Sequence, residues 1–228
     1  MTPRGASFFT GEARMPFITF EGMEGSGKTT QARRLASVLS GFYGRNVVLT
    51  KEPGARTAVG RGVREVLLAP RDTILYPDAE FFLFLADRAQ HVREIVQPAL
   101  QRGDWVVSDR YVGSTFAYQL VARDMSDRAV RMQAIKLATG GLMPDLQIVI
   151  LIDPEEGMRR AIARGGKLDR LEQEELAFHH RVHEGFREWI TCSPNCTAIV
   201  DDGVKSVEEI HHEILARVHH KFSPLCVA

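Results

Sequence analysis

FITFEGMEGSGKTTQ, residues 17–31, is the stretch of sequence that decides the fold. Its first part, 17–20, is an apolar run that favours a β-strand, and residues 22–29 satisfy the pattern G-x-x-x-x-G-K-S/T of a phosphate-binding loop. Residues 30–39 have the composition of a helix. A glycine-rich loop between a strand and a helix points backbone N–H groups at phosphate oxygens, and the start of the helix adds its positive dipole end. The stretch therefore predicts a site for a nucleoside triphosphate.

The loop combines two side chains that have specific roles with a backbone that follows the phosphates. Lys28 is expected to reach the β- and γ-phosphates, and the Thr29 hydroxyl is expected to hold Mg²⁺. The alternative is a glycine-rich turn that binds nothing, but the position between a strand and a helix argues against it. The residues expected to bind ATP are Gly22, Met23, Glu24, Gly25, Ser26, Gly27, Lys28, Thr29 and Thr30.

Composition indicates a globular chain and gives no reason to expect a highly charged partner. Of 228 residues, 44% are hydrophobic and 25% are charged, and Lys+Arg and Asp+Glu are both 29. This balance gives no net field toward nucleic acid or an acidic membrane, so neither is expected as a partner. No apolar run approaches the length of a membrane span, and residues 1–14 lack the apolar core of a signal peptide. We expect a cytoplasmic protein with one domain, residues 15–228, preceded by a disordered extension, residues 1–14.

The cysteines do not form a recognised spacing. Cys192, Cys196 and Cys226 are an odd number and contain no C-x-x-C pair, which is typical of inert thiols in a cytosolic protein. A metal site made of Cys192, Cys196 and nearby histidines is the weaker alternative, because no second ligand pair has a familiar spacing.

Further apolar runs alternate with helical patterns along the chain. The runs that resemble buried parallel strands are 46–50, 105–108, 146–152 and 197–200, and the helical patterns are 31–42, 60–68, 78–102, 126–139, 154–164, 172–189 and 207–219. This alternation predicts an α/β fold, a five-stranded parallel sheet with helices on both faces. The longest helix is expected to bend or break at Pro98.

Charged residues follow two of the predicted strands. Ligands of open α/β sheets bind beyond the carboxyl ends of the strands, so Asp109 is placed to hold Mg²⁺ and Arg110 to clamp an anionic acceptor. The alternative is an Asp–Arg pair that only ties two loops together. After the second strand, Pro53 begins a turn at the mouth of the site, where Arg56 or Arg64 could add positive charge. A turn that only shapes the backbone and does not contribute to the site is an equally good interpretation of residues 51–54.

Two helical segments carry further candidates. Phe84 and Arg88 lie one helical turn apart, which suits stacking and hydrogen bonding of a nucleobase, although a role of Phe84 in the core alone is the more common use of such a pattern. Residues 154–171 carry several arginines and a Gly165-Gly166 pair, which suits a short Arg-rich lid over transferring phosphate. A solvated charged face is the alternative for this segment.

Together these blocks resemble the thymidylate kinase family over about residues 17–207. FEGMEGSGKTTQ is similar to the family's FEGxEGxGKTTQ loop, KEPG to its REPGG, DRYVGSTFAYQ to its DRYxxSxxAYQ, and LDRLE to its (L/M)DRxE. Eukaryotic-type members carry an arginine at the position of Gly25, so the resemblance is to the bacterial type, in which a lid arginine supplies the catalytic charge. One departure is KEPGARTAVG, which replaces REPGGTxxG with one extra residue.

The resemblance implies transfer of the γ-phosphate of ATP to dTMP with Mg²⁺, giving dTDP and ADP, by a homodimer with its long helix in the interface. The implied catalytic residues are Lys28, Asp109, Arg110, Arg159 and Arg164, with Arg160 and Arg170 as further lid candidates, and the implied Mg²⁺ ligands are Thr29 and Asp109. The residues implied to bind dTMP are Glu24, Pro53, Arg64, Phe84, Arg88, Arg110, Ser114, Thr115, Tyr118 and Gln119. Two rivals stay open at this point: another nucleotide or nucleoside kinase on the same scaffold, and an ATP-driven switch with no acceptor pocket.

Overall fold

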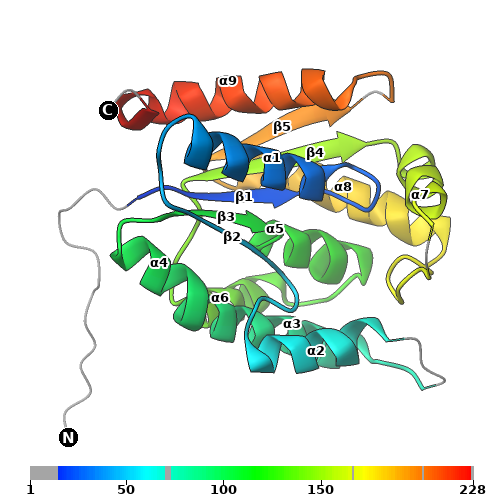
Figure 1. The fold of residues 1–228 in the computed structure, drawn as a ribbon. Helices are drawn as coiled ribbons and strands as arrows, with labels where there is room; N and C mark the ends of the chain where they lie inside the picture. Colours follow the sequence, from blue (N-terminus) through cyan, green and yellow to red (C-terminus); the bar gives the residue numbers. More distant parts are fainter. Residues whose placement is uncertain (1–14, 70–72, 166, 202, 227–228) are drawn as a thin grey trace, which may run out of the picture.

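A parallel sheet forms the centre of the molecule. The computed structural model describes residues 15–69, 73–165, 167–201 and 203–226, so the predicted extension, residues 1–14, lies outside the described residues. The five strands are parallel and lie in the order β2-β3-β1-β4-β5 (Figure 1). They are β1 (Phe17–Glu21), β2 (Val47–Lys51), β3 (Trp105–Asp109), β4 (Leu146–Ile152) and β5 (Cys196–Asp201). The predicted five-stranded parallel sheet is confirmed.

Four of the strands run one residue further toward their carboxyl ends than their apolar residues indicate. The added residues are Glu21, Lys51, Asp109 and Asp201. Strand pairing continues through them, because Asp109 pairs with Phe20 on one side and with Lys51 on the other. The ladder is made by backbone groups and does not require an apolar side chain. Charged side chains are therefore held on rigid strands at the edge of the sheet where ligands bind.

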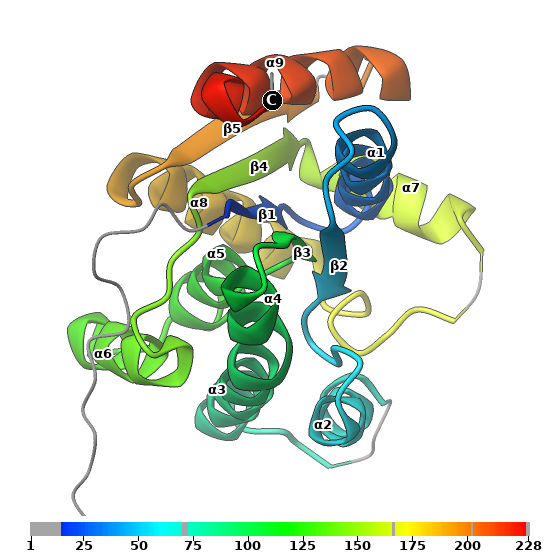
Figure 2. The same ribbon diagram turned by 60° about the vertical axis from the view of Figure 1, so that its left-hand side comes forward.

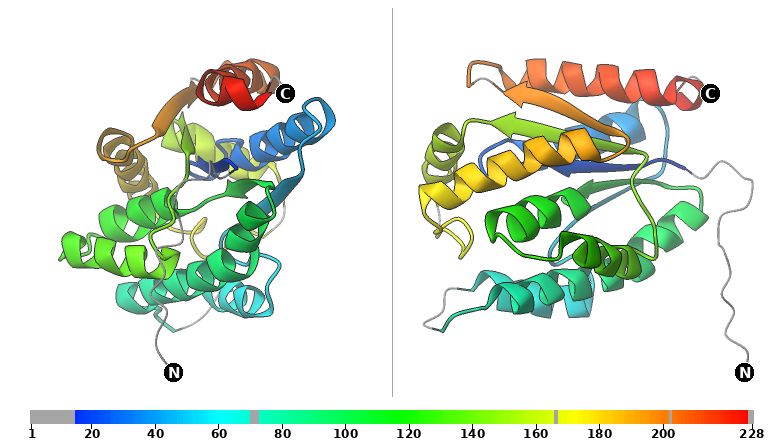
Figure 3. Two further views of the ribbon diagram at one scale, coloured as in Figure 1. Left: turned by 90° about the vertical axis from the view of Figure 1, so that its left-hand side faces the viewer. Right: turned by 180° about the vertical axis from the view of Figure 1, so that it is seen from behind.

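Helices cover both faces of the sheet, as predicted. On one face, α1 (Lys28–Gly41) and α9 (Val207–Cys226) enclose a core around Phe20, Ile148 and Ile214 (Figure 1). On the other face, α8 (Leu176–Cys192) and α6 (Arg128–Thr139) contribute to a larger core (Figure 3). Beyond β2, α2 (Ala58–Leu68) packs on α3 (Pro77–His91) (Figure 2). No helix within the described residues is both long and apolar enough to cross a membrane.

The long helix predicted over 78–102 consists of three segments. After α3 the chain continues as a π-helix, η1 (Val92–Val96), and then as α4 (Gln97–Gln101), which carries Pro98 in its first turn. A proline has no N–H, and its ring would clash with the carbonyl four residues earlier in an α-helix. The wider π-helical turn before Pro98 relieves that clash, so the predicted distortion lies one turn upstream of the proline.

Other boundaries differ because side chains compete with the backbone. The helix predicted from Glu172 begins at Leu176, since residues 169–172 form a turn in which Asp169 accepts hydrogen bonds from the N–H groups of Leu171 and Glu172. The segment after β3 was not predicted to be helical. It forms α5 (Val112–Thr115) and a second π-helix, η2 (Phe116–Ala122), and α7 (Pro154–Ala163) follows β4.

The contact between η2 and α8 depends on a glycine. A Cβ atom placed on Gly185 would lie 2.7 Å from Ala117 Cα, so the two helix backbones meet with no side chain between them. Because the neighbouring atom belongs to the backbone, it cannot move aside without moving η2, which carries the predicted site residues Tyr118 and Gln119.

We therefore expect Gly185→Ala to lower the free energy of unfolding by about 1–3 kcal/mol, since it overpacks a helix contact. The matched control is Gly62→Ala in α2, where an added Cβ meets no described atom within 4 Å. This change should stabilise the protein by roughly 0.5–1 kcal/mol through helix propensity. Urea unfolding of both variants measures the two effects, and equal stabilisation by both substitutions would contradict the close approach of η2 and α8.

Candidate active site

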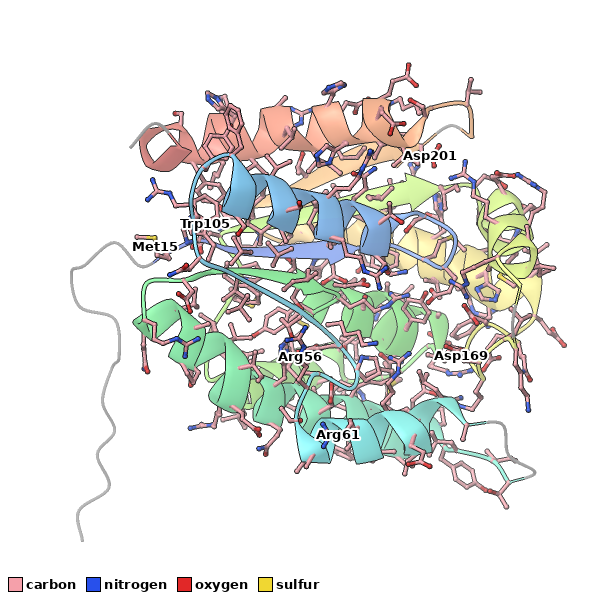
Figure 4. All side chains as sticks on the ribbon, in the orientation of Figure 1. Met15, Arg56, Arg61, Trp105, Asp169 and Asp201 are labelled. Carbon is pink, nitrogen blue, oxygen red and sulfur yellow. The ribbon has the colours of Figure 1, made fainter. Side chains whose placement is uncertain are left out.

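A cavity of about 740 Å³ opens at the carboxyl ends of the strands. Its walls come from the phosphate-binding loop, the ends of β2 and β3, helices α2, α3 and η2, and the segment between α7 and α8. In Figure 4, Arg61 on α2 and Asp169 in the segment after α7 approach this region from separate parts of the chain, and both line the cavity. The volume lies within the range of small-molecule sites, roughly 300–1,000 Å³.

Most of the side chains predicted to act in the site line this one cavity. Those that line it are Glu24, Lys28, Thr29, Pro53, Arg64, Phe84, Arg88, Asp109, Arg110, Ser114, Thr115, Tyr118, Gln119 and Arg164. Arg159 and the loop residues Gly22, Met23, Gly25, Ser26, Gly27 and Thr30 are not among the lining residues. Of the two arginines proposed near the Pro53 turn, Arg64 lines the cavity, whereas Arg56 is exposed outside it.

The phosphate-binding loop has the backbone that its glycines predict. Gly22, Gly25 and Gly27 have φ angles of 141°, 76° and 79°, values that side chains with a Cβ rarely adopt. Helix α1 begins at Lys28, and no side chain of a described residue caps its N-terminus, so its first N–H groups are open to an anion. Lys28 Nζ donates to Met23 O at 3.2 Å and lies 3.9 Å from Glu24 Oε2.

A pair of glycines brings helix α7 against the loop. A Cβ on Gly25 would lie 2.1 Å from Gly157 O, and a Cβ on Gly157 would lie 2.7 Å from Glu24 O. A larger residue at position 25, such as an arginine, cannot fit without displacing α7. A positively charged side chain at position 25 is therefore excluded by the packing of α7 on the loop.

The four lid arginines have different partners. Arg164 lines the cavity and pairs with Glu172 Oε1 at 2.6 Å. The other three lie outside the lining: Arg159 pairs with Glu156, Arg160 with Glu156 and Asp201, and Arg170 with Glu80 and the carbonyl of Leu67. Of these four arginines, Arg164 is the one that lines the cavity.

Arg110 lines the cavity and is held by several hydrogen bonds. Its φ of 77° is in the left-handed region, which is unusual for a residue with a side chain and is typical of functional positions. Its Nη1 donates to Gly22 O at 2.9 Å and to Ser114 Oγ at 3.0 Å, and its Nη2 donates to Glu24 Oε1 at 2.6 Å. Burial opposes ionisation of Glu24, but Arg110 and Lys28 outweigh it and hold the pKa of that carboxyl well below its usual value.

Thr29 and Asp109 meet at the loop. Thr29 Oγ1 donates to Asp109 Oδ2, and Asp109 Oδ1 is buried with no hydrogen-bond partner among the described residues. An unpaired buried carboxylate oxygen is costly unless a cation or donor joins it. A hydroxyl and a carboxylate with one oxygen to spare fit the ligand preference of Mg²⁺. The alternative of an Asp109–Arg110 tie does not describe the structure, because the two side chains bond to different partners.

The deeper end of the cavity is built on a buried charge network. Arg88 is 1% exposed, and its Nε donates to Glu52 Oε2 at 2.8 Å while its Nη1 donates to Thr115 Oγ1 at 2.8 Å. His91 Nδ1 lies 2.7 Å from Glu52 Oε1, so Glu52 is held from two sides. Phe84 is only 8% exposed but lines the cavity, so it serves both as core and as a wall of the site.

Glu21 is a buried carboxylate beside the cavity that the sequence analysis missed, and it bonds to the lining residue Ser114. It is fully buried at the end of β1 and accepts from Ser114 Oγ at 2.6 Å and from Gly113 N at 3.2 Å. Burial raises the pKa of Glu21 to about 7, against the lowering effect of the Ser114 hydrogen bond and of Arg110. The signal in the sequence was a carboxylate that directly follows an apolar strand, as at Glu52.

The cysteines and histidines do not form a second site in the described part of the chain. Cys192 and Cys196 are free thiols, and burial raises the pKa of Cys196 to about 12, which makes it unreactive. No group of three or more His, Cys, Asp or Glu side chains within the described residues is placed to hold a metal ion.

The fold and the cavity define a P-loop nucleotide kinase, with a triphosphate loop and an arginine-lined pocket at one edge of a parallel sheet. Residues 20–214 match the family model described as Thymidylate kinase. This chain belongs to the thymidylate kinase family.

Curated relatives and a solved structure agree with the family model. The thymidylate kinase of Carboxydothermus hydrogenoformans is 47% identical over 203 residues, covering 88% of this chain and 95% of the relative. That of Nitratidesulfovibrio vulgaris strain Miyazaki F is 43% identical over 213 residues, covering 91% and 97%. The crystal structure of thymidylate kinase from Ehrlichia chaffeensis superposes with a TM-score of 0.72 at 31% identity, covering 91% of this chain and 100% of that one. These relatives are bacterial.

The raised pKa of Glu21 predicts how the free energy of unfolding depends on pH. The native state holds a proton on this carboxyl up to about pH 7, whereas the unfolded chain releases it near 4.5, so its contribution to stability is lost as the pH rises between these values. Glu21→Gln stays neutral and lacks this dependence. Between pH 5 and pH 8, wild type should therefore lose about 2 kcal/mol of unfolding free energy relative to this variant. Urea unfolding of both proteins across this range measures the difference, and parallel pH profiles would show that Glu21 does not titrate there.

Proposed function

We infer that this member of the thymidylate kinase family transfers the γ-phosphoryl group of ATP to dTMP, giving ADP and dTDP, and we propose roles for its residues. One observation carries the proposal: Lys28, Arg110 and Arg88 line the same cavity. A triphosphate on the loop and a monophosphate in the deeper pocket then meet end to end. Phosphoryl transfer needs alignment and charge neutralisation more than covalent chemistry, and this cavity supplies both.

On the donor side, the chain offers backbone N–H groups, the start of α1 and Lys28. We propose that the loop residues 22–30 follow the phosphates of ATP and that Lys28 leaves Met23 O to contact the β- and γ-phosphates. Thr29 and Asp109 are proposed to hold Mg²⁺, directly or through water. When bound, this ion would neutralise phosphate charge. Transfer should accordingly cease when Mg²⁺ is chelated and return when it is restored.

On the acceptor side, the cavity has two guanidinium groups: that of Arg110 near the phosphate-binding loop and that of Arg88 at the deeper end. Arg110 Nε donates to no described residue, so it is open to an oxygen of the acceptor phosphate, and Arg64 on α2 is proposed to assist it. We propose that Glu24 faces the deoxyribose and Tyr118 the side where a ribose 2′-hydroxyl would lie. Pro53, Phe84, Arg88, Ser114, Thr115 and Gln119 are proposed to enclose the base.

Arg164 is proposed as the lid arginine that stabilises charge on the transferring group. It lines the cavity while paired to Glu172, so it can change partner over a short distance when a phosphate arrives. Arg159, in contrast, is 68% exposed and pairs with Glu156 three residues away. Movement of residues 154–171 over the cavity would also exclude water, which could otherwise accept the phosphoryl group.

We further propose a homodimer that acts in the cytoplasm, where its substrates are made and used. Large apolar side chains lie exposed on the packed pair α3 and α6: Phe82 is 60%, Val130 64% and Leu137 80% exposed. Large exposed apolar side chains on two neighbouring helices are consistent with an interface. The α3 helix also carries Phe84 and Arg88, so a second chain on α3 would support the acceptor pocket from behind.

An assay of ADP release against a panel of nucleoside monophosphates tests the function. Wild type should turn over dTMP, and ATP alone should give little ADP. Turnover of ATP without an acceptor would favour a switch, and preference for AMP or a nucleoside would favour a rival kinase.

Lys28→Ala and Arg110→Ala should each reduce kcat/KM for dTMP by at least about a hundredfold, the effect of losing one preorganised charge. Arg56→Ala, outside the cavity, is the matched control, and near-normal turnover by either active-site variant would defeat the assigned role.

The dimer is tested by the molar mass in solution. Wild type should have twice the mass of one chain, and Phe82→Asp should shift the mass toward one chain because it buries a charge in an apolar contact. The control is Phe42→Asp, since Phe42 is 82% exposed but lies at the end of α1 on the opposite face of the sheet. A single-chain mass for wild type, or dissociation by both substitutions alike, would contradict the proposed interface.

A further inference from the structure

Glu80 is a buried carboxylate that lies behind the cavity and does not line it. It is in the first turn of α3 and has no exposed surface. Gln119 Nε2 donates to its Oε1 at 2.8 Å, Arg123 Nη2 donates to its Oε2 at 3.2 Å, and Arg170 Nη2 donates to the same Oε2. Three parts of the chain thus converge on one side chain: η2, the segment that follows it, and the segment between α7 and α8.

These partners keep Glu80 ionised. Burial opposes ionisation, but Arg123 and Arg170 outweigh it, and the pKa of Glu80 lies below its usual value. An ionised carboxylate only accepts hydrogen bonds. The amide of Gln119 must therefore turn its NH₂ group to Glu80, and its carbonyl oxygen is left for the cavity that Gln119 lines.

Arg88 presents the opposite polarity in the same cavity. Its Nε and Nη2 are occupied by Glu52 and by Tyr111 O, and one hydrogen of Nη1 is used by Thr115. A guanidinium has two hydrogens on Nη1, so the second has no partner among the described residues, and Arg88 lines the cavity. The wall therefore offers an acceptor from Gln119 and a donor from Arg88.

We propose that Glu80 is a positioning residue that sets the base selectivity of the acceptor site by fixing the orientation of the Gln119 amide. The resulting acceptor and donor match a pyrimidine that carries a hydrogen on N3 and a carbonyl at C4. A cytosine ring has the reverse pattern at both positions and would leave two buried polar groups unpaired. The inference rests on the proposed function, because it assumes that a pyrimidine nucleotide binds in this cavity.

Arg170 gives this arrangement a second consequence. Its backbone N–H donates to Leu68 O, its Nε donates to Leu67 O, and its Nη2 donates to Glu80. Arg170 therefore ties the end of α2 and the segment after α7 to the carboxylate that orients Gln119. Movement of the Glu80 carboxylate away from Gln119 would therefore also disturb its contact with Arg170.

The test uses Glu80→Gln, which keeps the shape of the side chain but can both donate and accept, so the Gln119 amide is free to turn over. The ratio of kcat/KM for dTMP to that for dCMP is measured on each protein preparation. This ratio is independent of the fraction of folded enzyme, because both substrates meet the same active molecules. It should fall by at least about tenfold, the effect of mispairing one buried hydrogen-bonding group. The ratio of dTMP to dUMP should not change, because both bases present the same N3 and C4 groups.

Two further variants separate positioning from general damage. Glu174→Gln removes the other carboxylate bound to Arg123 without touching Gln119, and it should leave the dTMP/dCMP ratio unchanged. Gln119→Leu should lower this ratio by itself, and adding Glu80→Gln to it should change the ratio no further. The proposal is overturned if Glu80→Gln keeps the wild-type ratio, if Glu174→Gln lowers it equally, or if the effects of Glu80→Gln and Gln119→Leu multiply. Failure of wild type to turn over dTMP would instead refute the proposed function.

Discussion

The rest of the site depends on the neutralisation of buried charge at the carboxyl edge of the sheet. Arg110 is paired with Glu24, Arg88 with Glu52, and Arg170 with Glu80, and each of these carboxylates is partly or fully buried. An unpaired charge in such surroundings costs several kcal/mol. The edge can therefore hold the cations that phosphates require only because acidic residues occupy the space between them. This also explains how a chain with equal numbers of acidic and basic residues can build an anion site.

The close approach of backbones is the second constraint, and it limits which parts of the chain can place a charged side chain in the cavity. Gly25 and Gly157 allow α7 to lie directly on the phosphate-binding loop, and Gly185 allows α8 to lie on η2. A side chain at position 25 is excluded by this contact, so the loop cannot supply its own arginine. The segment after α7 starts from a fixed point beside the loop, and that position brings Arg164, rather than Arg159, to the cavity.

The sequence was sufficient for the parts of the fold that local patterns determine. The loop at residues 22–29 and the five apolar runs predicted a parallel sheet with a site at the carboxyl ends of its strands, because strand, glycine and helix signals there agree. Residues 112–122 were not predicted to be helical, because their helix is short, is partly π-helical and is held by packing on α8. Glu21, Glu52 and Glu80 were missed for a related reason. Their partners are distant in sequence. The one local signal, a carboxylate at the end of an apolar strand, occurs at Glu21 and Glu52 but does not show what these side chains contact. Which lid arginine lines the cavity was equally hidden, because it depends on the direction of α7.

The two ends of the acceptor cavity are built differently, and this difference has a mechanistic consequence. At the deep end, Arg88 and Gln119 are each 1% exposed and are fixed by Glu52 and Glu80, so the groups proposed to contact a base are already held in place. At the phosphate end, Arg164 has a side chain 61% exposed, and Arg110 and Lys28 share Glu24. These internal pairs must loosen as an incoming phosphate takes over part of the carboxylate's role. Partner exchange avoids the cost of an uncompensated cation both before and after binding. A rigid deep end with an adaptable phosphate end thus places selectivity in groups that do not move and leaves movement to the groups that follow the transferring charge.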